Sequence, residues 1–254
     1  MKIKLTIVSV FVLVVVMAPQ MRAGPTVGIK YTGMLTSADD GVSDNEIVVT
    51  GDWSPPPEDV VVTLEWEVWQ NLDAVSGAVT SWHYKYILTT PDTAGNISHF
   101  TIEKSPEFIG SDLFNLSFSV TGGTPPDALV LEIGDLPNEG PEGSEGLSAI
   151  KFETPGDGYD LGYVFQVEFD SRRCPVWGDF YAKDGSVPGS DPKVWNEAWN
   201  AGWDDPDPIA APASGSINSH ILRPDTVCIP APGAILLGSM GTILVGWMRR
   251  RKTL

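Results

Sequence analysis

Apolar and polar residues alternate with a period of two along much of the chain. In the run 60–69, apolar side chains fall at every second position, and the run 82–88 repeats the pattern. Successive side chains of a strand point to opposite faces, so both runs predict half-buried strands. The stretch 70–77 between them suits a hairpin connection. The apolar positions of the first run are Val60, Val62, Leu64, Trp66 and Val68.

Further short strands are predicted on both sides of this hairpin, separated by turn-forming residues. The chain contains 26 Gly and 21 Pro, which gather in the connections. Many short strands at this spacing favour an all-β protein, a β-sandwich or jelly-roll-like ectodomain spanning 24–227. The stretch 134–147 has the composition of a linker, but a split into two subdomains there is not favoured. The other predicted strands are 46–50, 97–103, 113–121, 128–133, 149–153 and 163–169.

Three tryptophans near the end of this region stand four residues apart, at Trp195, Trp199 and Trp203. On a helix this spacing would place all three on one face. One interpretation is a short helix that packs an aromatic face over the end of the sandwich. The other is a platform on which the apolar faces of sugar rings stack.

Both ends of the chain carry targeting patterns. Residues 1–23 read as a secretory signal peptide, with a cationic start, an apolar stretch and an Ala23 cleavage site. Near the other end, the apolar run 233–248 follows Pro232 and would form a helix of roughly 24 Å, slightly short of a ~30 Å hydrocarbon core. The positive-inside rule puts the basic cluster that follows in the cytoplasm and the ectodomain outside. That cluster is Arg249, Arg250, Arg251 and Lys252.

The order of these elements in 228–254 resembles the PEP-CTERM sorting signal of Gram-negative bacteria. The motif residues are Pro230, Ala231, Pro232 and Gly233, with Ala231 where the family usually has Glu. The resemblance implies an exosortase-like processing enzyme as partner and a link to exopolysaccharide matrices. It also implies that the protein is exported, is held at the inner membrane by its tail at least transiently, and then reaches the cell surface or the extracellular space.

The ectodomain is strongly acidic. All 33 acidic residues and only nine of the 16 basic ones lie between the signal peptide and the sorting motif. This charge disfavours nucleic acids and anionic membranes as partners of the ectodomain. Two acidic clusters offer oxygen ligands for Ca²⁺, but neither matches a known calcium loop, so no metal site is assigned. They are Asp39, Asp40 and Asp44, and Asp204, Asp205 and Asp207.

The chain has two cysteines, Cys174 and Cys228, which are disulfide candidates in an exported protein. Buried free thiols are the alternative. A nucleophilic Cys174 is not supported by its surroundings, and the sequence contains no signature of a serine hydrolase, a zinc protease or a phosphate-binding loop.

Three hypotheses follow for function. The first is a non-enzymatic, exported surface or matrix protein of unknown molecular activity. The second is a surface-displayed carbohydrate-binding module that uses Trp195, Trp199 and Trp203. The third is a glycoside hydrolase, which needs two carboxylates across a cleft that the sequence does not reveal.

Overall fold

The computed structural model describes residues 28–38, 44–54, 61–91, 96–155, 160–186 and 195–227. Within these ranges the chain forms thirteen strands and two short 3-10 turns, and it contains no α-helix. The strands are β1 (Lys30–Thr36), β2 (Ile47–Val49), β3 (Thr63–Leu72), β4 (Val79–Thr89), β5 (His99–Glu103), β6 (Leu113–Thr121), β7 (Val130–Leu136), β8 (Leu147–Glu153), β9 (Val164–Ser171), β10 (Arg173–Gly178), β11 (Phe180–Ser186), β12 (Trp195–Asn200) and β13 (Ile221–Val227); the 3-10 turns are η1 (Gly51–Trp53) and η2 (Gly110–Asp112).

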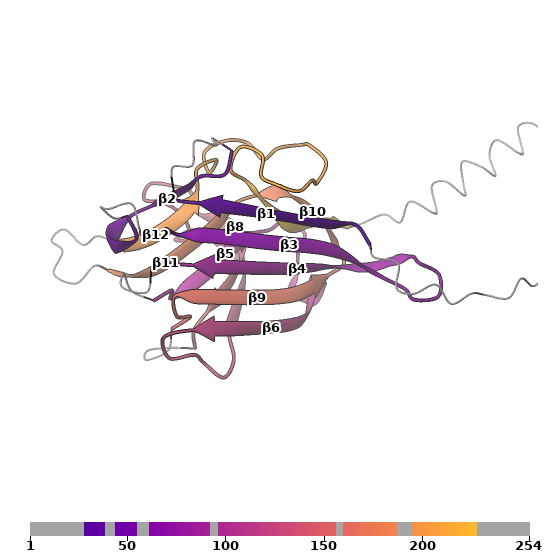
Figure 1. Cartoon of the computed structure of the whole chain (residues 1–254), viewed down its shortest axis with the longest axis horizontal. Coiled ribbons are helices and arrows are strands. Elements are labelled where there is room, and N and C mark those ends of the chain that lie inside the picture. The colour runs from indigo at the N-terminus through magenta and orange to yellow at the C-terminus, as the bar shows by residue number, and fades with distance from the viewer. Residues whose placement is uncertain are drawn as a thin grey trace, which may run out of the picture.

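The strands form two large antiparallel sheets that face each other in a sandwich-like arrangement (Figure 1). One sheet has the order β1-β3-β4-β9-β6, and the other has the order β2-β12-β11-β5-β8-β7. A third, two-stranded sheet pairs β10 with β13. The all-β architecture with antiparallel sheets confirms the fold class that the alternation predicted.

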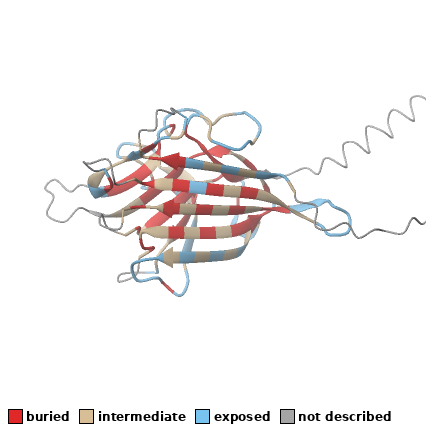
Figure 2. Ribbon diagram, viewed as in Figure 1, coloured by how far each residue is buried: buried red, intermediate tan, exposed pale blue. Residues whose placement is uncertain are grey.

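The core lies between the two large sheets. Along β3 the buried residues Leu64, Trp66 and Val68 alternate with Glu65 and Glu67, which face outward. The same alternation runs through the neighbouring strands as bands of buried and less buried residues (Figure 2). Phe100 of β5 is in ring contact with Tyr86 of the five-stranded sheet, so aromatic packing joins the two layers. Burial of these side chains supplies the main stabilisation of the sandwich.

Two buried tyrosines attach the β10–β13 pair to the five-stranded sheet. The Tyr84 hydroxyl donates to the carbonyl of Arg173 at 2.8 Å, and the Tyr86 hydroxyl donates to the carbonyl of Leu222 at 2.7 Å. Burial raises the pKa of both hydroxyls well above their ordinary value. Both hydroxyls therefore remain donors, which a buried phenol needs.

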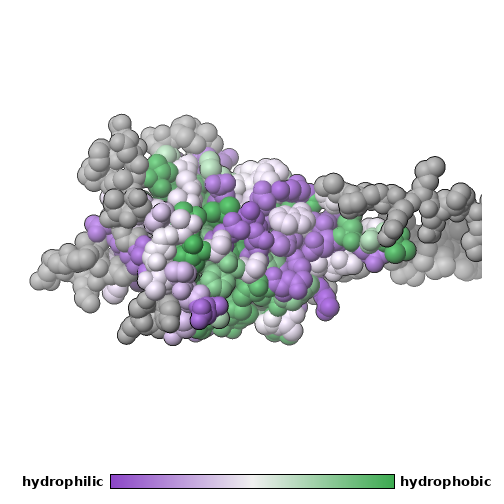
Figure 3. Space-filling view, turned by 60° about the horizontal axis from the view of Figure 1, so that its bottom comes forward, coloured by the Kyte–Doolittle hydropathy of each residue, from purple (hydrophilic) through white to green (hydrophobic). Residues whose placement is uncertain are grey.

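The lower edge of the five-stranded sheet is apolar. β6 is the last strand there, and its apolar residues are only half-buried. Figure 3, which brings this edge forward, shows apolar side chains gathered beside a polar band. The half-buried apolar residues of β6 are Leu113, Phe114, Leu116, Phe118 and Val120.

The alternation predicted most strands of the first 170 residues correctly. The predicted range 113–121 coincides with β6, and 46–50, 82–88, 97–103 and 149–153 overlap β2, β4, β5 and β8. β3 begins three residues later than predicted, and β1, β10, β11 and β13 were not predicted. The predicted hairpin is confirmed, because β3 and β4 pair antiparallel, but the connection is 73–78 since β3 extends to Leu72.

The predicted helix at Trp195 is wrong. Residues 195–200 form strand β12, which pairs with β11 on one side and β2 on the other. Trp203 lies in the turns that follow β12. The two neighbouring strands offer β12 a full ladder of hydrogen bonds, and this tertiary gain outweighs the weak helix propensity of the segment.

Both ends of the chain lie outside the described residues. This holds for the signal peptide 1–23, for Cys228 and the sorting motif 230–233, and for the predicted membrane helix with its basic cluster. No helix in the described ranges has the length and apolar character needed to cross a membrane. Cys174 is disulfide-bonded, and its pairing with Cys228 stays a prediction.

Candidate functional site

β12 presents Trp195, Glu197 and Trp199 on the outward face of the six-stranded sheet. Because strand side chains alternate, these three residues share one face, while Ala198 points into the core. On the neighbouring strand β11, Tyr181 stands opposite Trp199 and Lys183 stands opposite Glu197. The outer surface of this part of the sheet therefore consists of aromatic rings and one pair of opposite charges.

A hollow of ≈ 770 Å³ lies over this surface. Its floor is formed by β11 and β12, and its wall is the connection between β7 and β8. Trp195 keeps 39% of its surface exposed, and Trp199 is half-buried. We call this hollow the tryptophan groove; it is lined by Thr50, Pro137, Asn138, Gly140, Pro141, Glu142, Gly143, Ser144, Lys183, Trp195, Glu197 and Trp199.

The wall of the tryptophan groove is anchored by Glu139, which is only 6% exposed. Its carboxylate lies 2.9 Å from His99 Nε2 and 3.1 Å from Lys151 Nζ, and it accepts a hydrogen bond of 3.1 Å from the Thr101 hydroxyl. Burial alone would raise the pKa of Glu139, but the contacts with His99 and Lys151 outweigh burial and lower it. The linker-like stretch of the sequence is thus tied to the sheet by a buried ionised carboxylate.

Trp203 supports the same wall from below. Its indole meets the ring of Tyr181 edge to face, with the ring centres 6.3 Å apart. The backbone of Gly140 lies directly on this indole, since a side-chain carbon at Gly140 would stand 2.7 Å from Trp203 Cζ2. Gly140 also has a φ of 147°, which L side chains rarely adopt. Glycine is therefore required where the loop crosses the tryptophan.

Lys183 and Glu197 form an ion pair on the floor of the groove. Lys183 Nζ lies 2.9 Å from Glu197 Oε1 and 4.5 Å from the centre of the Trp195 ring, a cation–π contact. The Tyr181 hydroxyl donates to the same Glu197 oxygen at 2.7 Å. Burial and this hydrogen bond raise the pKa of Tyr181 well above its ordinary value. Glu197 is thus held by two donors, and the ammonium group of this ion pair stands over the Trp195 ring, which still keeps part of its surface exposed.

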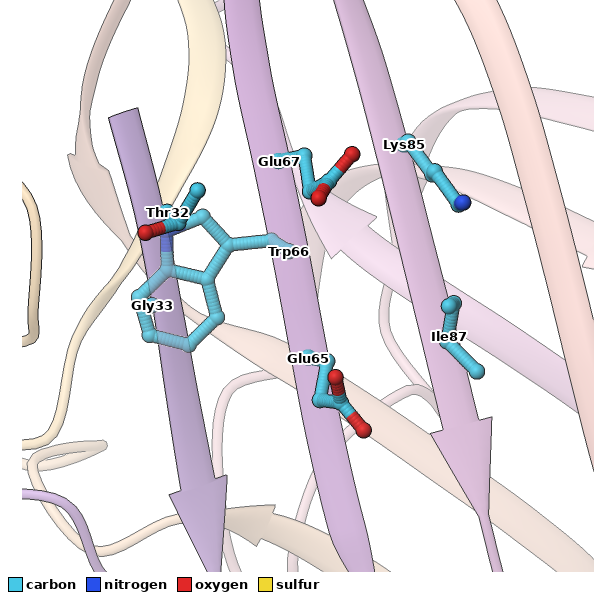
Figure 4. Close-up of a pocket in the computed structure, with 7 residues that line it drawn as sticks. All are labelled: Thr32, Gly33, Glu65, Trp66, Glu67, Lys85 and Ile87. Carbon is cyan, nitrogen blue, oxygen red and sulfur yellow. The ribbon is translucent and has the colours of Figure 1, made fainter. Parts of the chain in front are cut away.

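A second hollow, on the five-stranded sheet, is too small for a typical ligand site. It measures ≈ 90 Å³ and lies between strands β1, β3 and β4 (Figure 4). Ligand sites in proteins usually occupy about 300–1,000 Å³. In this hollow the ring of Trp66 lies across Gly33, where any side chain would overlap it. This hollow therefore results from close packing of the strands. It is lined by Thr32, Gly33, Glu65, Trp66, Glu67, Lys85 and Ile87.

The acidic clusters of the sequence do not form calcium loops in the described residues. Asp44, Asp204 and Asp205 are exposed, and Asp39 and Asp40 lie outside the described ranges. Asp207 instead approaches Arg223, with Oδ2 2.8 Å from the guanidinium.

One group of ligand-type side chains within metal-binding reach does occur among the described residues: Asp179, Asp207 and His220. Their ligand atoms lie within 4.8 Å of one another. Burial raises the pKa of Asp179 to about 7. The hydrogen bond from Asn200 acts in the opposite direction, and the nearby negative charge of Asp207 adds to the increase. Burial likewise raises the pKa of Glu103 beside Asp179 to about 7, although Arg223 acts in the other direction. This corner of the fold therefore contains more carboxylates than it can stabilise as anions.

Sequence reasoning named the tryptophans but missed the other groove residues. Lys183 carries no motif in the sequence, and it lies inside β11. The loop 137–144 looked like a linker because of its Gly, Pro and Glu content. No local signal distinguishes Glu139 from the neighbouring acids Glu142 and Glu145, because its partners His99 and Lys151 are far away in sequence. The bonded Cys174 carries no free thiol, which fits the expectation that it is not a nucleophile.

The described residues define an all-β protein built from antiparallel sheets, with one large groove on the outside of the six-stranded sheet. Comparison of the chain with protein-family models, with curated proteins and with solved structures found no match.

Proposed function

We propose that the chain is an exported surface or matrix protein whose jelly-roll-like β-sandwich ectodomain binds a neutral polysaccharide in the tryptophan groove. The observation that carries the proposal is the placement of Trp195 and Trp199 on one outward face of β12, at the floor of a ≈ 770 Å³ hollow. Flat aromatic rings bind the apolar faces of pyranose rings, and the polar loop that walls the groove can hydrogen-bond their hydroxyl groups.

The size of the groove supports an oligosaccharide ligand. Its volume lies in the range of about 300–1,000 Å³ that ligand sites occupy. The groove is walled by one loop and floored by strands, so a chain-like ligand can lie along it. Trp203 does not line the groove. Two tryptophans therefore contact the sugar in this proposal, and the third supports the loop.

The charge of the protein favours a neutral ligand. The chain has a formal net charge of −17, so an anionic polymer would be repelled. Lys183 does not change this, because it is paired with Glu197 at 2.9 Å. Polysaccharides without carboxylate or sulfate groups are thus the proposed class.

Sequence features at both ends of the chain support the proposal that the protein is exported. The signal peptide 1–23, the motif Pro230-Ala231-Pro232-Gly233 and the basic cluster 249–252 support sorting through a PEP-CTERM-like tail. In this proposal the helix 233–248 holds the protein at the inner membrane, and an exosortase-like enzyme is its processing partner. A protein displayed in this way would meet polysaccharide of the surrounding matrix.

The proposal is tested by screening the purified protein against an array of neutral and anionic polysaccharides, with and without Ca²⁺. Stacking of a ring on an aromatic side chain contributes about 1–3 kcal/mol by analogy with base stacking, so Trp195→Ala should weaken binding at least about five-fold. Trp69→Ala is the matched control, because Trp69 lies on the outer face of the other sheet, stacked on His83. Absence of binding to every glycan, or equal losses in both variants, would overturn the proposal.

A further inference from the structure

Three ligand-type side chains from distant parts of the sequence meet at one corner of the sandwich. Asp179 is the single residue between β10 and β11, and His220 immediately precedes β13. The antiparallel register pairs Gly178 with Ile221, which brings Asp179 next to His220. Asp207 comes from the long connection 201–219, drawn in orange to yellow at the top of Figure 1. The fold therefore brings two carboxylates and one imidazole together at this corner.

The imidazole of His220 directs an unprotonated nitrogen toward the two acids. Its Nδ1 lies 3.2 Å from the carbonyl of Ile217, which can only accept, so Nδ1 carries the proton and Nε2 keeps a lone pair. His220 is completely buried, and Nε2 has no hydrogen-bond partner among the described residues. A buried polar atom without a partner is costly, so this lone pair is available to a ligand that lies between the two acids.

The distances at His220 differ from those at the other two histidines. His83 Nδ1 and His99 Nε2 each lie within 2.9 Å of a carboxylate oxygen, so they contact their acids directly. His220 Nε2 lies 3.5 Å from Asp179 Oδ1 and 3.7 Å from Asp207 Oδ1. Two ligands around a tetrahedral ion with bonds of about 2.0–2.1 Å stand about 3.3 Å apart. The gap at His220 is thus close to the spacing of metal ligands and too long for a hydrogen bond.

Each candidate ligand is oriented by a second group. Asn200 donates to Asp179 Oδ1 at 2.6 Å, which leaves that oxygen a further lone pair. Arg223 holds Asp207 Oδ2 at 2.8 Å, so that Oδ1 faces the imidazole. The carbonyl of Ile217 fixes the tautomer of His220. Metal sites in proteins are built with such outer partners.

The corner also contains an excess of negative charge. Arg223 faces Glu103 at 3.0 Å, Asp207 at 2.8 Å and Asp225 at 3.6 Å, and Asp179 adds a fourth carboxylate beside them. One guanidinium cannot neutralise four carboxylates. A divalent cation between Asp179, Asp207 and His220 would remove most of the surplus without displacing Arg223.

We propose that Asp179, Asp207 and His220 bind one divalent transition-metal ion of the zinc class, with water completing its coordination. The imidazole nitrogen favours zinc-type ions over Ca²⁺ or Mg²⁺, which prefer oxygen ligands alone. The ion fastens the connection 201–219 to the sandwich, because Asp207 lies within that connection and His220 directly follows it. This inference does not depend on carbohydrate binding.

The test uses the full chain, purified without a histidine tag in a mild detergent, stripped with chelator and titrated with Zn²⁺ by calorimetry. We expect one equivalent to bind and the thermal unfolding temperature to rise. His220→Gln and Asp207→Asn should each weaken Zn²⁺ binding at least 100-fold. Asp205→Asn changes an exposed acid two residues from Asp207 in the same connection, and this control should bind like the wild type.

Substitution of Co²⁺ provides a second readout. Its visible absorption should report nitrogen and oxygen ligands and disappear in Asp207→Asn. If His220→Gln does not fold, as judged by circular dichroism, Asp207→Asn and the Co²⁺ spectrum decide the question. The inference is overturned if Zn²⁺ does not bind more tightly than millimolar, if Ca²⁺ binds in its place, or if the folded variants bind Zn²⁺ as the wild type does.

Discussion

Replacement of Glu139 by Gln tests whether the wall of the tryptophan groove is held by a buried charge. The Glu139 side chain is 8% exposed and contacts His99, Lys151 and Thr101. Breaking a buried ion pair by removing one partner usually costs about 3–5 kcal/mol. Here Lys151 retains Glu153 at 3.2 Å, and a Gln oxygen can still accept from Thr101, so we expect a loss of about 2–3 kcal/mol at pH 7.

The effect of Glu139→Gln should depend on pH. The pKa of Glu139 is lowered from 4.5 in the folded protein, so its stabilisation is present above about pH 4.5 and is lost as the pH falls through the folded-state value. Urea unfolding at pH 7 should show the midpoint falling by about 1 M, for an m value of about 2–3 kcal/mol/M. At pH 3 the difference between variant and wild type should shrink, because below about pH 4.5 this carboxyl binds a proton more readily in the unfolded chain than in the folded protein.

Glu142→Gln is the matched control, since Glu142 is an exposed acid of the same loop. Its free energy of unfolding should stay within about 0.5 kcal/mol of the wild-type value at both pH values. Equal midpoints for the two variants, or a Glu139→Gln difference of the same size at pH 3 and pH 7, would refute the reasoning.

Three further predictions concern the ends, the disulfide and the packing of β1. Deletion of 233–254 should release the protein from the membrane fraction, and unchanged fractionation would contradict the predicted anchor. Peptide mapping without reductant should recover Cys174 linked to Cys228. This bond would stabilise the fold by about 4 kcal/mol in a chain-entropy estimate for the loop that it closes. A separate Cys228 peptide with a free thiol would exclude the bond. Gly33→Ala should lower the free energy of unfolding in urea by about 2 kcal/mol or more, because the new methyl group overlaps the Trp66 ring. The control Gly134→Ala, where the added carbon has no atom within 4 Å, should lower it by less than about 0.5 kcal/mol. Equal effects of the two substitutions would contradict the packing of β1.

Alternation of side chains predicted the strands because it follows directly from burial of one face. The tryptophans show where local spacing fails. Residues i and i+4 share a face on a helix and on a strand alike, so Trp195 and Trp199 are on one face as expected, but on strand β12 instead of a helix. The segment forms a strand instead of a helix because it pairs with β11 and β2. The sequence of a short segment does not reveal such pairing partners.

The remaining site residues depend on long-range contacts that the sequence does not reveal. Glu139 has the surroundings of a linker, yet its charge is balanced by His99 and Lys151 from other strands. Asp179 and His220 are neighbours only because β10 and β13 pair in a particular register. Neither arrangement has a fixed spacing that a motif could capture.

The central claim is that a neutral glycan occupies the tryptophan groove. The most direct measurement is hydrogen–deuterium exchange of the full chain with and without a saturating oligosaccharide from the array. The account predicts slower exchange in 137–144 and in β12, while β1 and β3 on the opposite sheet stay unchanged. Protection of β1 and β3 instead, or no protection at saturating ligand, would contradict it.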